Sequence, residues 1–161
     1  MLSFLRLKQP PATDLLTSKL YNENTFYTTF KRDLKHCKSE AIIESPYMTM
    51  TRVLQLRPVL KKLVKRGVKV TVNTRFPSHH DEHLRIQGWL SAKALKQIGV
   101  KVYFFSDYHH RKIAILDGRI LWEGSLNILS QCYSREIMRR IESEDLSKQM
   151  TQFLRLKRFY W

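Results

Sequence analysis

Residues 110–127 carry polar residue types at fixed offsets, and these offsets constrain both the local fold and the chemistry. The order is His110, Lys112, Asp117 and then Gly124-Ser125-Leu126-Asn127, which gives the spacing H-x-K-x4-D-x6-G-S-x-N. Asp117-Gly118 lies between two apolar runs and predicts a hairpin that joins strands over 110–116 and 120–123. Side chains alternate along a strand, so His110 and Lys112 are expected on one face.

This pattern is typical of chemistry at phosphorus. A histidine beside a fixed positive charge suits attack on a phosphorus atom that bears nonbridging oxygens. The hydroxyl of Ser125 and the amide of Asn127 add uncharged donors for the same oxygens. Asp117 has two explanations, because a tight turn accounts for an Asp-Gly pair without any role in the site.

The motif resembles the HKD signature of the phospholipase D superfamily. The similarity is greatest to the small members with one copy per chain, the stand-alone endonucleases with a G-S-x-N tail. It implies that His110 attacks phosphorus to form a phosphohistidine, that Lys112 holds phosphate oxygens, and that Asp117 supports the site. It further implies that Ser125 and Asn127 bind phosphate and that no metal or cofactor is needed.

Glu136 follows the motif on the next predicted strand. In related nucleases an acidic residue after G-S-x-N orients the histidine, and the resemblance extends this role to Glu136. Surface charge on an edge strand is the alternative explanation.

A single copy of the motif has a consequence for assembly. The double displacement in this family needs one histidine as nucleophile and a second to protonate the leaving oxygen. Because this chain has one copy, the resemblance implies a homodimer in which two chains share one composite site.

The charge of the chain favours a polyanionic substrate. Its 29 basic and 14 acidic residues give a net charge of +15, a field that attracts nucleic acid without sequence choice. We expect nucleic acid as the partner, DNA rather than RNA; a solvated basic face is the alternative. The expected phosphate contacts are Arg52, Arg57, Lys61, Lys62, Lys65, Arg75 and Arg111.

The periodicity predicts an α/β fold. Residues 1–16 are expected to be an irregular lead-in, and residues 17–161 a single phospholipase D-like catalytic domain. Helices are expected over 18–37, over 53–64 with Pro58 near its start or at a kink, up to Gly99, and over 145–159. Strands are expected over 41–45, 68–73, 100–105, 110–116, 120–123 and 134–141. Strands joined first by helices and then by a hairpin predict a mixed sheet with helices on both faces, the α/β sandwich that the resemblance also implies.

Several other functions are less favoured. A start with a short apolar run and no long apolar stretch predict a cytoplasmic protein without stable membrane insertion. The cluster at 79–83 lacks a familiar metal-ligand spacing, so no metal site is expected. We conclude that the chain is expected to be a metal-independent endonuclease. Hydrolysis of cardiolipin or phosphatidyl headgroups is the first alternative, and a nucleic-acid-binding module of a larger helicase or restriction system is the second.

Overall fold

The fold is organised around a single seven-stranded sheet. The computed structural model describes residues 17–156. Its strands are β1 (Lys19–Asn22), β2 (Glu40–Glu44), β3 (Lys69–Arg75), β4 (Lys101–Phe105), β5 (Ile113–Leu116), β6 (Ile120–Gly124) and β7 (Ile137–Glu142). Its helices are α2 (Phe26–His36), α3 (Met50–Lys65), α4 (Glu82–Lys96) and α5 (Glu144–Phe153), with a short 3-10 helix η1 (Pro77–His79).

The sheet is mixed, as predicted. Its strand order is β1-β7-β6-β5-β2-β3-β4. Strands β2, β3 and β4 are parallel, while β5, β6, β7 and β1 continue the sheet from β2 in antiparallel pairs. The carboxyl ends of β2, β3 and β4 and the start of β5 therefore meet at one edge of the sheet, which is where open α/β folds usually bind their ligands.

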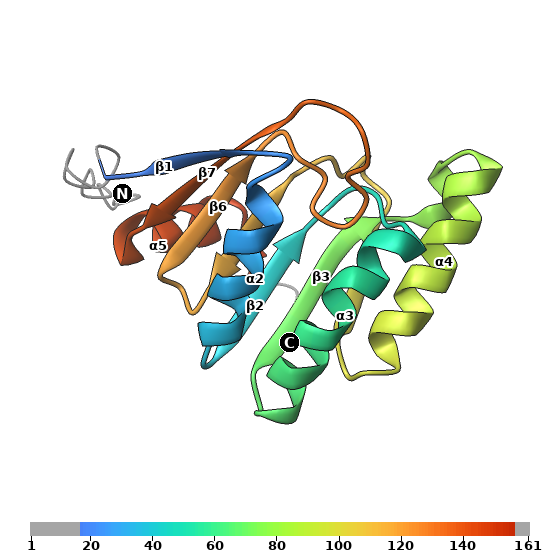
Figure 1. The fold of residues 1–161 in the computed structure, drawn as a ribbon. Helices are drawn as coiled ribbons and strands as arrows, with labels where there is room; N and C mark the ends of the chain where they lie inside the picture. Colours follow the sequence, from blue (N-terminus) through green and yellow to red (C-terminus); the bar gives the residue numbers. More distant parts are fainter. Residues whose placement is uncertain (1–16, 157–161) are drawn as a thin grey trace, which may run out of the picture.

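Helices cover both faces of the sheet, which confirms the predicted layers. Figure 1 shows α2, α3 and α4 on the near face and α5 behind the other face. The near-face core includes Leu60, Val72 and Trp122, all fully buried, and a second core around Ile115 and Leu154 lies under α5. Burial of these two apolar layers supplies the main driving force for folding.

Several predicted boundaries were wrong. The expected helix over 18–37 is strand β1 followed by α2, because Lys19–Asn22 pair with β7, a contact that is distant in sequence. The strands expected over 110–116 and 134–141 begin only at Ile113 and Ile137. The β2 partner of Ile113 is Glu44, its last residue, and Ser45-Pro46 follows, so residues 110–112 have no β2 partner to pair with.

Helix α3 is longer than predicted. It begins at Met50, so Pro58 lies in its interior rather than near its start. Proline removes the hydrogen bond that would reach the carbonyl of Leu54. Because Leu54 and Pro58 are both exposed, water can satisfy that carbonyl.

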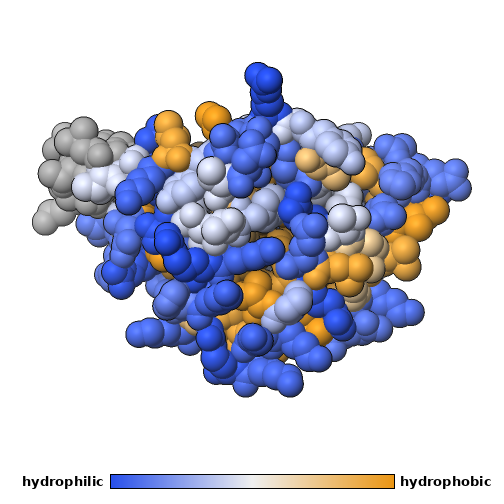
Figure 2. Space-filling view, in the orientation of Figure 1, coloured by the Kyte–Doolittle hydropathy of each residue, from blue (hydrophilic) through white to orange (hydrophobic). Residues whose placement is uncertain are grey.

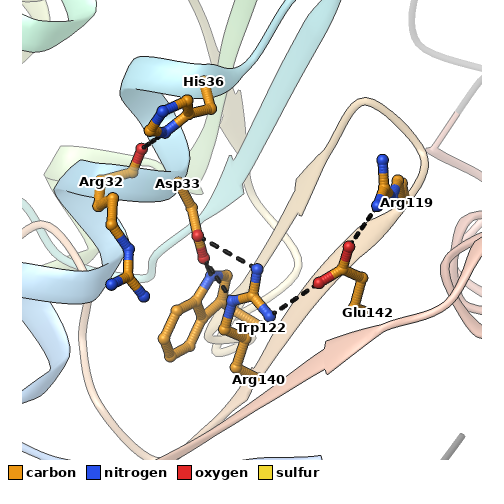
Figure 3. A network of polar contacts seen from close by, with 7 residues as sticks. All are labelled: Arg32, Asp33, His36, Arg119, Trp122, Arg140 and Glu142. Atoms are coloured by element: carbon orange, nitrogen blue, oxygen red, sulfur yellow. Dashed lines mark hydrogen bonds and ion pairs between the residues drawn. The ribbon is translucent and has the colours of Figure 1, made fainter.

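A buried ion pair fastens α2 to the sheet (Figure 3). Asp33 of α2 accepts hydrogen bonds from Trp122 Nε1 at 3.0 Å and from Arg140 Nε at 2.7 Å. Arg140 also pairs with Glu142, which in turn binds Arg119. Breaking such a pair leaves an uncompensated buried charge, so this contact fixes how α2 sits on β6 and β7.

The ends of the chain are outside this description. The predicted lead-in over 1–16 and the end of the last predicted helix, 157–159, lie outside the described residues. Within residues 17–156, none of the helices has the length and apolar character to cross a lipid bilayer.

Candidate active site

Most of the motif residues meet in one pocket at the edge of the sheet. The pocket has a volume of about 760 Å³. It is lined by residues from the segment before β5, the end of β6 and the start of β7, together with β1: Leu20, His110, Arg111, Lys112, Ile113, Glu123, Gly124, Ser125, Asn127, Glu136, Ile137 and Arg139. The tertiary structure thus brings together five of the six predicted catalytic residues, and Asp117 is the exception.

His110 and Lys112 are in direct contact. Lys112 Nζ lies 2.6 Å from His110 Nδ1 and also donates to the carbonyl oxygen of His110 at 2.8 Å. An ammonium group can only donate, so Nδ1 accepts and a neutral imidazole carries its proton on Nε2. Burial, Lys112 and Arg75 lower the pKa of His110, which favours the neutral form of the ring. Burial likewise lowers the pKa of Lys112, an effect that Glu136 opposes.

Gly124 is required by close backbone packing. An added Cβ would lie 2.2 Å from the carbonyl oxygen of Ile137 and 2.9 Å from the Cα of Met138. No side chain fits there, because real Cβ atoms do not approach backbone atoms so closely. The glycine therefore lets β6 and β7 meet next to Ser125, which explains its place in the motif.

Ser125 and Glu136 form a hydrogen-bonded pair. The Ser125 hydroxyl donates to the Glu136 carboxylate and accepts from the backbone N–H of Ile137 at 3.1 Å. Ser134 donates to the same carboxylate at 2.8 Å. The expected contact between Glu136 and His110 is not formed in this structure, where Lys112 is the hydrogen-bonding partner of Nδ1. The Glu136 carboxylate is bound by the hydroxyls of Ser125 and Ser134. Glu136 also precedes β7, so it does not lie on the strand that was expected to place it next to the histidine.

Asp117 lies at the opposite end of β5 from His110. Its carboxylate accepts hydrogen bonds from the backbone N–H groups of Lys38, Ser39 and Glu40, from the Ser39 hydroxyl and from the Cys37 thiol. Burial alone would raise the pKa of Asp117, but the backbone donors outweigh it and hold the pKa far below the usual range. Its φ of 54° matches the predicted turn. Asp117 fixes the loop between α2 and β2, so any support it gives to the site is indirect.

A buried polar cluster lies on the other side of the chain from His110. His109 Nε2 and Arg111 Nη1 both lie 3.6 Å from Glu44 Oε2, and Asn73 donates to Glu44 Oε1 at 2.8 Å. Burial raises the pKa of Glu44, and burial and the nearby Arg111 lower the pKa of His109 to about 4. The sequence indicated that His109 points away from His110. It gave no sign of Glu44, because that contact joins β2 to the segment before β5.

The predicted phosphate-binding residues divide into three groups. Arg111 lines the pocket, and Arg75 is close enough to His110 to lower its pKa. Arg52 instead donates to the carbonyl of Gln131 at 2.6 Å and stacks on Tyr27, and Arg57 donates to the carbonyl of Ala94. The remaining residues, Lys61, Lys62 and Lys65, are exposed on the C-terminal half of α3.

These three lysines are far from the pocket. Helix α3 starts at the site edge and runs towards the start of β3, and Lys61 is about 16 Å along its axis from Met50. Figure 2 shows hydrophilic residues over much of the helical face, with hydrophobic patches at its centre and right. Helix α3 therefore carries these lysines away from the edge of the sheet that holds the motif, and their contact with nucleic acid stays a prediction.

Sequence reasoning missed some residues of the site. Arg139 lines the pocket next to Ile137 and Leu20, whose side chains are 61% and 63% exposed. Tyr47 follows Ser45-Pro46 at a strand end, so the sequence allowed it to line the cleft but favoured core or turn packing; its ring lies 5.9 Å from the His110 ring, edge to face. Alternation along β7 offers a signal for Arg139 and Ile137, but only the pairing of β1 with β7 brings Leu20 to them.

Within residues 17–156, no group of three or more His, Cys, Asp or Glu side chains is arranged to hold a metal ion. The residues of the predicted loop cluster are used locally. Asp81 caps α4 by accepting from the N–H of Leu84 at 2.9 Å, and His80 packs on Tyr47 at 4.8 Å between ring centroids.

The chain belongs to the phospholipase D-like family. Residues 30–157 match the family model described as cardiolipin synthase, PLD-like domain, and members of this superfamily are phosphodiesterases. No curated protein sequence matches the chain.

Solved structures share the fold at low sequence identity. The phospholipase D family member Nuc from Salmonella typhimurium has a TM-score of 0.71 and 14% identity over 85% of this chain and 90% of its own. NucT from Helicobacter pylori has a TM-score of 0.66 and 16% identity over 84% and 91%. Phosphatidylserine synthase from Haemophilus influenzae Rd KW20 has a TM-score of 0.60 and 14% identity over 84% of this chain and 38% of its own. At these identities the likeness shows the fold alone.

Proposed function

We propose that the protein is a metal-independent endonuclease that hydrolyses nucleic-acid phosphodiester bonds through a phosphohistidine. The observation that carries this proposal is the contact of His110 Nδ1 with Lys112 Nζ in a pocket that also contains Asn127, Arg111 and Arg139. This arrangement places a neutral imidazole among cations and amide donors, which suits a phosphate diester.

Substrate binding would change the partner of Lys112. With Lys112 on Nδ1, the proton of His110 sits on Nε2, which then has no lone pair for attack. A phosphate oxygen in the pocket would draw Lys112 Nζ away, so that the proton can move to Nδ1 and leave a lone pair on Nε2. Nε2 then attacks phosphorus, the P–N bond forms and the P–O bond to the leaving group breaks.

The leaving oxygen needs a proton, and one chain offers one motif histidine. We assign this proton to the partner subunit's His110 in a symmetric homodimer, where that ring is the imidazolium and the attacking ring is neutral; an anionic substrate shared by both rings can enforce these opposite protonation states. In the second step the same partner group takes a proton from water as the water attacks phosphorus and the P–N bond breaks. The hydrogen-bonded pair of Ser125 and Glu136 would keep the wall of the pocket in place through both steps.

Charge favours nucleic acid as the substrate, and DNA is the first candidate. The net charge of +15 attracts a polyanion. Of the predicted phosphate contacts, Arg75 and Arg111 are the two that lie near His110, so they are the candidates for binding the phosphate that is cleaved. The exposed lysines of α3 would add long-range attraction instead of direct contacts at the cleaved bond.

The central experiment is cleavage of single- and double-stranded DNA and RNA in excess EDTA. Wild type should cut, and His110→Ala should lose at least about a thousandfold in rate. His36→Ala is the matched control, since His36 is an exposed histidine at the end of α2. Cutting that stops in EDTA, or that survives in His110→Ala, would refute the phosphohistidine mechanism.

Mixed dimers test the composite site separately. If both histidines of a dimer are needed, activity should follow the square of the wild-type fraction when wild type and His110→Ala are refolded together. A linear dependence would show that each chain works alone.

A lipid phosphodiesterase is the second candidate. It is favoured by the description of the family model and by the exposed Leu20 and Ile137 beside the pocket, which could contact acyl chains. Release of phosphatidate or free headgroup from vesicles of cardiolipin and phosphatidylglycerol, absent in His110→Ala, would support it over nucleic acid.

A further inference from the structure

Aromatic and basic side chains border His110 on the side of β3 and β4. They come from the loop after β2, the end of β3, the η1 region and the loop before β5. We name this set the aromatic rim, and it consists of Tyr47, Arg75, His79, His80 and Tyr108. None of them lines the pocket of Ser125 and Glu136, whereas His110 lines that pocket and also contacts the rim through Tyr47.

The rim residues form a connected set. The Tyr47 ring lies 5.9 Å from the His110 ring and 4.8 Å from the His80 ring. The Arg75 guanidinium lies 4.7 Å from the centre of the Tyr108 ring, and Arg75 also donates to the carbonyl of His79 at 3.0 Å. The rings of His79 and Tyr108 are 6.0 Å apart with an angle of 31° between their planes. The rim thus offers flat rings together with one guanidinium group beside His110.

Packing does not explain the position of Tyr108. Its side chain is 74% exposed, and its backbone φ is 56°. A bulky residue rarely adopts positive φ, and such outliers gather at functional sites. The chain thus holds a large aromatic ring in solvent, two residues before the proposed nucleophile, at a position where it adds no packing to the core.

We propose that the aromatic rim stacks unpaired nucleobases next to the phosphate held at His110, so that the enzyme acts on single-stranded nucleic acid or unpaired segments. The inference rests on the proposed nuclease function. Every base presents a flat π-face, so stacking on tyrosine, histidine and arginine binds a strand without sequence preference. In a duplex these faces are covered by neighbouring bases. Acyl chains would instead need a continuous aliphatic surface, and the rim interleaves its rings with a cation.

The test is a binding measurement in the His110→Ala background, which keeps the substrate intact. A short single-stranded oligonucleotide is compared with an abasic oligonucleotide of equal length and charge, by fluorescence anisotropy at fixed salt. The normal strand should bind at least about fivefold more tightly. Adding Tyr108→Ala should remove most of this preference, while affinity for the abasic strand stays unchanged. Tyr108→Phe should retain the preference, because stacking does not need the hydroxyl.

A matched control excludes a general effect of removing an exposed ring. Phe153 is 81% exposed on α5 and has no place in the rim, so Phe153→Ala should leave both affinities unchanged. Equal binding of normal and abasic strands, or equal loss of both in Tyr108→Ala, would overturn the stacking role. Wild-type cleavage is scored separately on the same normal strand. Cutting without a base preference refutes the rim alone, and a base preference without cutting refutes the nuclease reaction while the rim stands.

Discussion

A substitution of Asp117 tests whether this motif residue stabilises the fold or takes part in the reaction. The motif places it among the catalytic residues, but its carboxylate binds the loop after α2, at the far end of β5 from His110. A hydrogen bond to a charged group contributes about 1.5–3 kcal/mol. Lys38 and Ser39 are exposed, so water can replace part of what Asp117 supplies. We therefore expect Asp117→Ala to cost about 3 kcal/mol, the value of one or two full bonds.

The cost should appear in stability and not in the chemical step. A loss of about 3 kcal/mol corresponds to a fall in Tm of roughly 10 °C for a chain of this size. Thermal unfolding is measured at fixed protein concentration, because a dimer would make Tm concentration-dependent. Turnover is measured well below the lower Tm, where kcat should change less than about threefold, an expected limit based on the distance between Asp117 and the pocket.

The stabilisation by Asp117 should also depend on pH, and the lowered pKa gives its direction. The folded-state pKa of Asp117 is lowered, so its contribution is complete above the ordinary aspartate pKa and disappears as pH falls through the folded value. The stability gap between wild type and Asp117→Asn should be full at neutral pH and shrink only in acid, below about pH 4. Asp145→Asn, in the exposed first turn of α5, should cost less than about 1 kcal/mol. A normal Tm with a collapsed kcat would refute this reasoning.

Three further results are expected. Gly124→Ala should destabilise the protein and lower activity together, since its Cβ meets the Ile137 carbonyl oxygen; an unchanged Tm in differential scanning fluorimetry would contradict this. Replacing the α3 lysines together by Gln (Lys61, Lys62 and Lys65) should lower DNA affinity at low salt with little effect on kcat. Arg111→Gln should instead lower the rate at which bound DNA is cleaved, and single-turnover kinetics separate the two effects. The folded pKa of His109 is about 4, below its ordinary value, so stability should fall as pH drops from about 6.5 towards 4. His109→Gln should flatten that slope in urea titrations, and an equal slope in both proteins would exclude His109 as its cause.

The local pattern was sufficient for much of the fold. Alternating and helical periodicities depend on which side chains face an apolar layer, so residues 41–45, 68–73 and 100–105 were identified as strands and the layers of the sandwich followed. The same logic failed for Lys19–Asn22. This edge strand exists because β7 pairs with it, and its own four residues carry no signal strong enough to separate it from α2.

The candidate site divides in the same way. The sequence by itself determined which reactive groups are available, because His110, Lys112, Gly124 and Asn127 flank the two strands of one hairpin and so lie at the same end of it. Only the tertiary structure decided which other groups meet them. Glu44 reaches His109, and Tyr108 reaches Arg75, across strands that are neighbours in space and distant in the chain. Spacing along one segment is fixed by bond geometry, but contacts between segments depend on how the whole sheet assembles.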